Sequence, residues 1–324
     1  MNLPRLGLGC MSLSHGYGVP LPLEDGVRFL RAALDEGVKL LDTATIYGGG
    51  RNEELVGQAI AGRREQVVLA SKGGMSVVDG VKTIDGRPAT LRAQVDASLG
   101  RLGVDHIDLY YLHRWDKTVP IGESVGALSE LVDAGKIGAI GLSEVSVTRL
   151  REAQAVATIT AVQNEYSLWS RNPELGILEA TRDTGVALVA FSPVARGFLA
   201  DALHDPDALT PKDLRRALPR FRPEHWQANV ALLPGWRALA AEAGCTPSQL
   251  ALVWLLSRGD HVVPIPGTTS VTHLRENLAA VDVIVDPALL ARAGELINTA
   301  TVSGPRYDAV QSGEVDAEAF EDAA

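Results

Sequence analysis

Short, nearly continuous apolar runs alternate with amphipathic segments along most of the chain. The runs have the length of β-strands, and their unbroken apolar character is typical of parallel strands that are covered on both faces. Seven runs are clear, at 39–44, 67–72, 106–113, 137–143, 161–166, 187–193 and 262–266. A weaker run at 281–285 is the candidate for an eighth strand.

The segments between these runs carry the signals of helix ends. The segment 24–36 places apolar residues on one helical face, and Gly37 stands where a left-handed residue would end the helix. The segment 123–134, followed by Gly135, repeats this pattern. At 246–249 the residues Thr-Pro-Ser-Gln have the form of a capping box, which predicts a helix directly after them.

Seven or eight strand–helix units over 324 residues predict an α/β fold, a closed (β/α)8 TIM barrel in a single domain. An open Rossmann sheet would carry a glycine fingerprint after its first strand, and the nearest glycine run, at 48–50, has the wrong spacing. We assign 1–301 to the barrel and 302–324 to a polar C-terminal tail that we expect to be only partly ordered. The stretch 196–233 is long for a connection, which indicates a functional loop containing short helices.

Charge and cysteine content narrow the class of function. The formal net charge of −10 disfavours an extended contact with nucleic acid, because phosphate binding requires clustered lysine and arginine. The two cysteines, Cys10 and Cys245, are too few for a disulfide framework. No apolar run reaches the roughly 20 residues of a membrane-spanning helix, and the N-terminal segment lacks a signal-peptide pattern. We therefore expect a cytoplasmic protein that acts on a small molecule, without a nucleic-acid or membrane partner.

Polar residues that can transfer a proton stand at the ends of three successive predicted strands. Asp42 and Tyr47 follow the first clear strand, Lys72 ends the second and His113 ends the third. Active sites of (β/α)8 barrels form at the C-terminal ends of the strands, so these four side chains are expected at one rim. Singly, each has a simple structural explanation, such as a turn, a solvated surface position or packing. It is their joint placement that indicates catalysis.

The chemistry of this quartet predicts a proton donor. A tyrosine with a pKa of about 10 donates poorly near neutrality, and a neighbouring ammonium such as that of Lys72 would lower this pKa. Asp42 can orient the ammonium, and His113 can donate a hydrogen bond to a carbonyl oxygen on which negative charge develops. Since none of these groups supplies a hydride, the reduction of a carbonyl here requires a cofactor.

The chain resembles the aldo-keto reductases in motifs that occur in the family's order from about residue 6 to residue 285. The matching segments are Asp-Thr-Ala-Thr-Ile-Tyr-Gly at 42–48, His-Ile-Asp-Leu-Tyr-Tyr-Leu-His at 106–113, Gly-Leu-Ser at 141–143, Val-Gln-Asn-Glu-Tyr-Ser at 162–167, Ala-Phe-Ser-Pro at 190–193 and Pro-Ile-Pro-Gly-Thr at 264–268. Within the family, the segments 113–116 and 166–171 resemble the bacterial aldehyde reductase and pyridoxal reductase-like branch.

The resemblance implies NADPH-dependent reduction of an aldehyde or ketone to an alcohol on a (β/α)8 barrel. It makes Asp42, Tyr47, Lys72 and His113 the catalytic residues, with Tyr47 as general acid. It also assigns cofactor-binding residues: Ser143, Gln163 and Phe191 at the nicotinamide, Ser192, Val194, Arg196 and Gly197 around the pyrophosphate, and Gly267, Thr268, Thr269, His273, Glu276 and Asn277 toward the adenosine end.

The chain departs from the family pattern at two places. Glu144 follows Ser143 where many relatives carry an asparagine that binds the carboxamide, and an ionised carboxylate has no donor to offer there. Thr269 and Ser270 stand where relatives place a cation for the 2′-phosphate, and His273 replaces a common arginine. Because hydroxyls supply no compensating charge, we expect NADPH to be preferred over NADH by a smaller margin than usual.

The substrate pocket and the class of function are less constrained. Aromatic and apolar candidates for the pocket lining, since such pockets are largely apolar, are Cys10, Met11, Trp115, Tyr166 and Trp169. A second class of function is a cofactor-binding regulatory or interaction subunit with little turnover, because a barrel alone does not decide function. The scattered histidines disfavour a metal-dependent hydrolase. Natural substrate, physiological direction and oligomeric state are left open.

Overall fold

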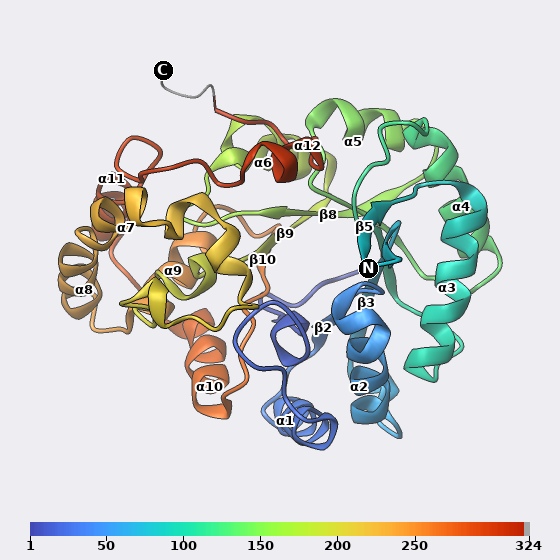
Figure 1. Ribbon diagram of the computed structural model, residues 1–324, viewed down its shortest axis with the longest axis horizontal. Helices are drawn as coiled ribbons and strands as arrows, with labels where there is room; N and C mark the ends of the chain where they lie inside the picture. Colours follow the sequence, from blue (N-terminus) through green and yellow to red (C-terminus); the bar gives the residue numbers. More distant parts are fainter. Residues whose placement is uncertain (321–324) are drawn as a thin grey trace.

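The computed structural model describes residues 1–320, which form a closed parallel barrel surrounded by helices (Figure 1). The barrel strands occur in the order β1-β2-β3-β6-β7-β8-β9-β10, and each pairs with its neighbour in parallel. Their bounds are β1 Leu8–Gly9, β2 Leu40–Asp42, β3 Val68–Gly73, β6 Leu109–Leu112, β7 Ile140–Ser143, β8 Ile159–Glu165, β9 Ala187–Phe191 and β10 Val262–Pro264. The amides of Gly7 and Gly9 donate to the carbonyls of Pro264 and Pro266, which closes the barrel between the first and last strands.

The helices cover the outside of the barrel, and one hairpin lies apart from it. The helical bounds are α1 Leu23–Asp35, α2 Arg51–Ile60, α3 Pro88–Leu102, α4 Ile121–Asp133, α5 Val147–Gln154, α6 Ile177–Thr184, α7 Pro223–Val230, α8 Leu233–Glu242, α9 Pro247–Leu256, α10 Val271–Ala279, α11 Pro287–Leu296 and α12 Ala309–Gly313. The hairpin consists of β4 Met75–Val78 and β5 Val81–Ile84, paired in antiparallel fashion after β3.

The predicted barrel and its seven clear strands are confirmed, but the predicted eighth strand is wrong. Residues Ala280–Asp282 form a 3₁₀ turn, and the chain then runs into α11 without joining the sheet. The eighth strand is β1, at the other end of the sequence. With two residues, it is too short to produce an apolar run that stands out. The hairpin of β4 and β5 was also missed, because its residues are exposed or half-buried and show no buried face.

Predicted helix ends are confirmed where the backbone requires particular residues. Gly37 and Gly135 follow α1 and α4 with φ angles of 91° and 72°, in the region that favours glycine. Thr246 accepts a hydrogen bond from the amide of Gln249, whose side chain accepts one from the amide of Thr246 in return, completing the capping box of α9. Among residues 1–320, no helix combines the length and apolar character needed to cross a bilayer.

Two apolar layers fix the strands and therefore the positions at which they end. Inside the barrel, side chains such as Leu40, Leu109, Tyr111 and Val189 pack against one another, and a larger layer fills the space between strands and helices. Gly141 on β7 is required by this packing, because a Cβ there would lie 2.3 Å from the ring of Tyr111. The core thus sets the register that brings the strand ends to one rim.

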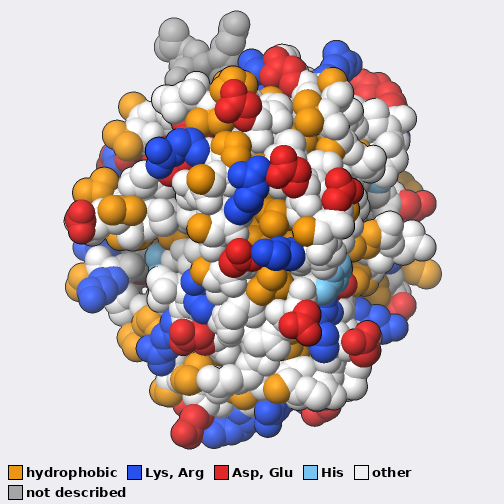
Figure 2. Space-filling model, turned by 90° about the vertical axis from the view of Figure 1, so that its right-hand side faces the viewer, with side chains coloured by type: hydrophobic (Ala, Val, Ile, Leu, Met, Phe, Trp, Pro, Cys, Tyr) orange, Lys and Arg blue, Asp and Glu red, His pale blue; other side chains and the backbone are white. Residues whose placement is uncertain are grey.

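Two segments cross that rim. The stretch predicted as a long functional loop contains four short 3₁₀ helices and α7, as expected from its sequence. The C-terminal segment passes over the rim beside α5 and α6 (Figure 1), where Asp316 accepts from the amide of Ser146 and Glu318 from that of Val147. On the face drawn in Figure 2, acidic and basic side chains are interspersed.

Candidate active site

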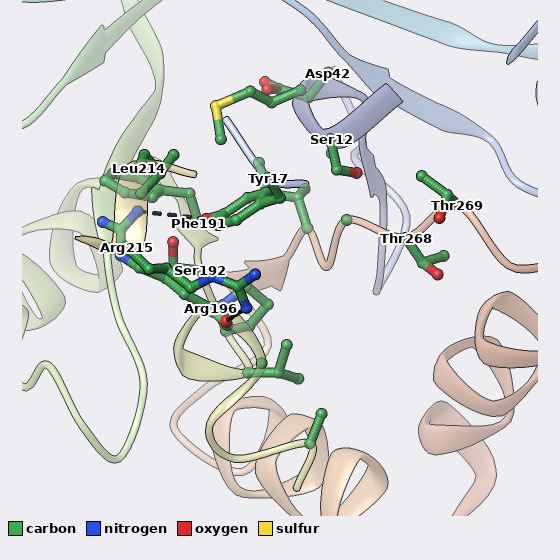
Figure 3. Close-up of a pocket in the computed structure, with 18 of the residues that line it drawn as sticks. Ser12, Tyr17, Asp42, Phe191, Ser192, Arg196, Leu214, Arg215, Thr268 and Thr269 are labelled. Atoms are coloured by element: carbon green, nitrogen blue, oxygen red, sulfur yellow. Dashed lines mark hydrogen bonds between the residues drawn. The ribbon is translucent and has the colours of Figure 1, made fainter. Parts of the chain in front are cut away.

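A cavity of about 660 Å³ opens at the C-terminal ends of the strands. Asp42, Tyr47 and His113 line it, and Lys72 lies fully buried behind them. In Figure 3, Tyr17, Phe191, Ser192, Arg196, Leu214 and Arg215 gather on one side, and Thr268 and Thr269 lie on the other. The volume is within the usual range of roughly 300–1,000 Å³ for ligand pockets, so the cavity is large enough for a sizeable ligand.

The quartet predicted from the strand ends is assembled as one network. The ammonium of Lys72 donates to a carboxylate oxygen of Asp42, to the carbonyl of Thr43 at 3.0 Å and to the hydroxyl of Tyr47 at 3.3 Å. Gln163 donates to the second oxygen of Asp42 at 2.8 Å. The ring of His113 meets that of Tyr47 edge to face, with centroids 5.9 Å apart. Lysine, carboxylate and phenol therefore form a continuous buried path that opens at the cavity.

Burial changes the expected acidity of Tyr47. Burial raises the pKa of Tyr47 above its ordinary value, because desolvation outweighs the opposing effect of the Lys72 charge, and Asp42 adds to the rise. Lys72 thus lowers this pKa as predicted, but the larger effect of burial, which the sequence did not indicate, makes the net change a rise. Its own pKa is also raised: burial disfavours the ammonium, but Asp42 and Tyr47 overcome that effect.

The surroundings of His113 favour its neutral form. Burial, followed by the positive charges of Arg114 and Lys72, holds the pKa of His113 well below its usual range. Its Nδ1 is buried without a hydrogen-bond partner among residues 1–320. A neutral imidazole still has one N–H to donate, so His113 can polarise a carbonyl without adding a proton to it.

A glycine-rich turn directs Tyr47 toward the cavity. Residues Tyr47–Gly50 form a 3₁₀ turn in which Gly48 and Gly49 have φ angles of 59° and 66°, positions that favour glycine. At Gly48 a Cβ would also approach the backbone and side chain of Ser14 to about 3.3 Å. Asn52, fully buried, then fixes the turn by donating to the carbonyl of Cys10 and to the hydroxyl of Ser14. The glycine run serves the geometry of this turn and does not follow the first strand of a Rossmann sheet, in agreement with its spacing.

Every residue predicted to bind the cofactor lines the same cavity. They are Ser143, Gln163, Phe191, Ser192, Val194, Arg196, Gly197, Gly267, Thr268, Thr269, His273, Glu276 and Asn277. The backbone has positive φ at Ser192, Ala195, Arg196 and Gly197, a conformation that costs non-glycine residues energy and that clusters at ligand sites. The cavity therefore fits an elongated ligand that runs from the quartet to Thr269.

The cations of this cavity are mostly paired within the protein. Arg196 donates to Glu165 at 2.8 Å and to Tyr307 at 3.4 Å. Arg215 donates to Asp213 at 2.7 Å. Burial opposes ionisation of Glu165, but Arg196 and the further arginines around it lower its pKa to about 2. These contacts were missed in the sequence, since Asp213, Arg215 and Tyr307 belong to segments without periodic patterns.

Glu144 contacts the C-terminal segment and does not line the cavity. Its carboxylate pairs with Arg306 at 2.5 Å and accepts from the amide of Glu165 at 2.7 Å. The side chain is fully buried, and its backbone has a φ of 54°. The residue that departs from the family's asparagine is therefore a contact to the segment after 301.

In the part of the cavity near Thr269, which the family resemblance assigns to the adenosine, none of the described lining residues is a lysine or an arginine. Thr269 and His273 line the cavity and are exposed. Arg275, the nearest arginine in the sequence, pairs with Glu36 at 2.6 Å and does not line the cavity. Glu276 accepts from the hydroxyl of Thr246, and Asn277 from that of Ser248, so both are positioned by α9.

The predicted substrate-pocket lining is mostly wrong. Met11 lines the cavity, whereas Cys10, Trp115, Tyr166 and Trp169 do not. Cys10 and Tyr166 have no exposed surface, and Trp169 packs on Phe198 and Phe221. Trp115 donates to the carbonyl of Val119 at 2.9 Å and lies against the guanidinium of Arg149.

Part of the apolar lining of the cavity comes from loop residues that were not among the predicted pocket residues. Tyr17, Val19 and Leu21 reach it from the segment before α1, and Leu214 reaches it from the long loop. The sequence feature that could have identified the residues before α1 is the presence of large apolar side chains in a segment rich in glycine and proline. Most of the aromatic residues predicted for the pocket are thus held by packing away from the cavity, and loop residues that were not predicted line it.

Comparison with known proteins places these observations in a family. Residues 5–297 match the model of the aldo/keto reductase family. The chain is similar to the solved structure of a glycerol dehydrogenase from Gluconobacter oxydans, with 30% identity, 94% of each chain covered and a TM-score of 0.81. It is also similar to an aldo/keto reductase from Klebsiella pneumoniae in complex with NADP and acetate, with 27% identity, 97% and 95% of the two chains covered and a TM-score of 0.72. An aldo-keto reductase from Bacillus halodurans in its holo form matches at 28% identity, with 94% of each chain covered and a TM-score of 0.71.

Proposed function

The chain belongs to the aldo/keto reductase family, and from this premise we propose that it reduces an aldehyde to an alcohol with NADPH, Tyr47 being the proton donor. Family membership makes the chain an NAD(P)H-dependent oxidoreductase that acts on carbonyl compounds. The observation that carries the finer proposal is the buried path from Asp42 through Lys72 to Tyr47, which opens at a cavity lined by every predicted cofactor residue.

The residues present fit NADPH as the cofactor. Ser143 and Gln163 would hold the carboxamide, Phe191 would lie against the nicotinamide, and Arg196 with Gly197 would hold the pyrophosphate. The backbone strain at Ser192 and Arg196 supports a ligand at this position, because such strain persists where function requires it. When bound, NADPH supplies the hydride that the quartet lacks.

The residues of the quartet supply the proton and the stabilisation of charge. The hydroxyl of Tyr47 gives its proton to the carbonyl oxygen, which becomes the alcohol oxygen. The phenolate that remains is stabilised by the ammonium of Lys72, and Asp42 keeps that ammonium charged. Neutral His113 donates a hydrogen bond to the same oxygen as negative charge develops on it. The raised pKa of Tyr47 keeps the proton on the phenol until the carbonyl oxygen can accept it.

A two-step experiment tests this function. Quenching of protein fluorescence gives the Kd of NADPH and NADH, and consumption of NADPH is then followed with benzaldehydes and with pyridoxal. We expect NADPH to bind more tightly and to be consumed only when an aldehyde is present. Tight binding without turnover would instead favour a cofactor-binding interaction subunit, and no binding would remove the cofactor assignment. A cytoplasmic location belongs to the same proposal.

A further inference from the structure

One arginine of the cavity differs from the others in its partners. Among the described residues, Arg114, Arg196 and Arg215 line the cavity. Arg196 is paired with Glu165 and Arg215 with Asp213, whereas no carboxylate lies within ion-pair distance of Arg114 in residues 1–320. A partly buried cation without a counter-charge has an unfavourable free energy, which an incoming anion would relieve.

The guanidinium of Arg114 is fixed in place but not saturated. Its Nη1 donates to the carbonyl of His113 at 2.7 Å and to the hydroxyl of Ser143 at 3.1 Å. Its Nε is buried and has no acceptor among residues 1–320. Since a guanidinium has five N–H donors in a rigid plane, donors remain for a ligand while the two bonds hold the group in position.

Arg114 lies at the proton-donor end of the cavity. It is the neighbour of His113 in sequence. Its positive charge adds to the effect of burial in lowering the pKa of His113, and it opposes the rise that burial causes in the pKa of Tyr47. Arg196 and Arg215 instead lie together on the side with Ser192 and Tyr17 (Figure 3). The phosphates of a dinucleotide would meet that side, and the carboxamide proposed for Ser143 is neutral. The bound cofactor therefore brings no anion to Arg114.

We propose that Arg114 binds a carboxylate of the substrate, so that the preferred substrates are aldehydes that carry a carboxylate. This proposal rests on the proposed reductase function and names its substrate class. A single guanidinium matches one carboxylate in charge and geometry, and such a pair is a charge-assisted, often bidentate contact. The substrate would be held at two points, its carbonyl oxygen by Tyr47 and His113 and its carboxylate by Arg114.

Paired substrates of equal shape test the proposal. Wild-type protein should reduce 4-formylbenzoate with a kcat/KM at least tenfold above that for 4-formylbenzamide, mainly through KM. Arg114→Gln should bring the ratio of the two kcat/KM values close to one, and Arg114→Lys should keep part of the preference. Arg5→Gln removes the same charge at an exposed site, where Arg5 pairs with Asp260. This control should leave the ratio unchanged.

A binding measurement separates this proposal from the reductase function. Calorimetric titration of the NADP⁺-loaded protein with benzoate and benzamide should give tighter binding of benzoate, and Arg114→Gln should abolish the difference. Reduction of 4-formylbenzamide without any preference for 4-formylbenzoate would overturn the role of Arg114 and leave the reductase function standing. Selective, Arg114-dependent binding of benzoate without turnover of either aldehyde would uphold the anion site and overturn the reductase function.

Discussion

The two ends of the cavity are built in different ways. At the proton-donor end, Asp42 and Lys72 come from β2 and β3, which are adjacent strands of the barrel, and Tyr47 comes from the turn that follows β2. At the other end, Arg196 of the long loop meets Glu165 of β8, and Tyr307 of the C-terminal segment contacts both. The first end depends on the register of the barrel core, and the second depends on segments that dock on its rim.

This difference predicts that one region determines the catalytic step and the other determines how tightly ligands are bound. Because strand ends are held by the packed interior, we expect the quartet to keep its geometry when contacts of the rim segments are broken. The rim is held by ion pairs, among them that of Glu144 and Arg306, which join residues far apart in the sequence. We therefore expect changes at the strand ends to alter turnover, and changes at the rim to alter stability and cofactor affinity.

The largest effect should follow removal of the proton donor at the strand end. Tyr47→Phe keeps the ring and removes the hydroxyl, so kcat should fall by roughly 10³-fold, within the range for loss of a general acid. The Kd of NADPH should change by less than about threefold, because the rim is untouched. Tyr110→Phe is the control, since Tyr110 is buried on β6 and does not line the cavity. Turnover of Tyr47→Phe near the wild-type rate would remove Tyr47 from the mechanism.

The next largest effect is expected at the rim, as a decrease in the free energy of unfolding. Glu144→Gln leaves Arg306 buried without its counter-charge, and breaking such a pair costs about 3 kcal/mol or more. Urea unfolding of the wild type and the variant measures this loss. The rim variant should also bind NADPH more weakly than the wild type.

Two matched variants sharpen this test. Glu130→Gln breaks the pair of Glu130 with Arg92, which is largely exposed, and should cost less than about 1 kcal/mol. In Glu144→Gln/Arg306→Gln both charges are removed, and part of the lost stability should return. Equal costs at the exposed and the buried pair would contradict the view that the rim is held by buried charge.

The rim should also be the part that is sensitive to acid. The pKa of Glu165 is lowered to about 2, so its stabilising contribution is complete above its ordinary pKa of 4.5 and is lost as the pH falls toward 2. Between pH 6 and pH 3, the wild type should lose about 2 kcal/mol of unfolding free energy that Glu165→Gln does not lose. Urea unfolding at the two pH values measures the difference, and equal losses in both proteins would exclude Glu165 as the acid-sensitive group.

The sequence predicts the residues at the strand ends well, because each of them is marked by a pattern in the residues directly around it. Three successive apolar runs carry a polar residue at or near their end, and the barrel makes these ends neighbours, so Asp42, Lys72 and His113 could be placed together. The missed strand β1 has two residues, too few for a pattern. The net rise in the pKa of Tyr47 could not be predicted because it depends on how much water the fold excludes, which no spacing of residues encodes.

The rim could not be predicted because its contacts join segments without periodicity. From the sequence, Glu144 was compared with the asparagine that binds the carboxamide in relatives. Its partner in the structure, Arg306, lies in a polar segment whose sequence gave no indication that it packs on the barrel. Tyr166 and Trp169 were placed in the pocket by chemical type, and packing instead buries them. By contrast, the residues that the family resemblance assigns to the cofactor all line one cavity, and most of them stand at strand ends or in the loops that follow them.

The smallest effect concerns the open adenosine end, where the rim carries hydroxyls in place of a cation. Thr269→Arg adds a guanidinium at an exposed position that lines the cavity. It should tighten NADPH about tenfold, near 1.4 kcal/mol, through contact with the 2′-phosphate, and it should leave the Kd of NADH nearly unchanged. Fluorescence titration with both cofactors measures the two affinities.

A control variant is Thr272→Arg, which places the same charge on α10, outside the residues that line the cavity. It should change the ratio of the NADPH and NADH affinities much less. An equal gain for both cofactors in Thr269→Arg would mean that the 2′-phosphate does not lie at Thr269. Since turnover with saturating NADPH should stay near the wild-type rate, this variant also separates affinity at the rim from chemistry at the strand ends.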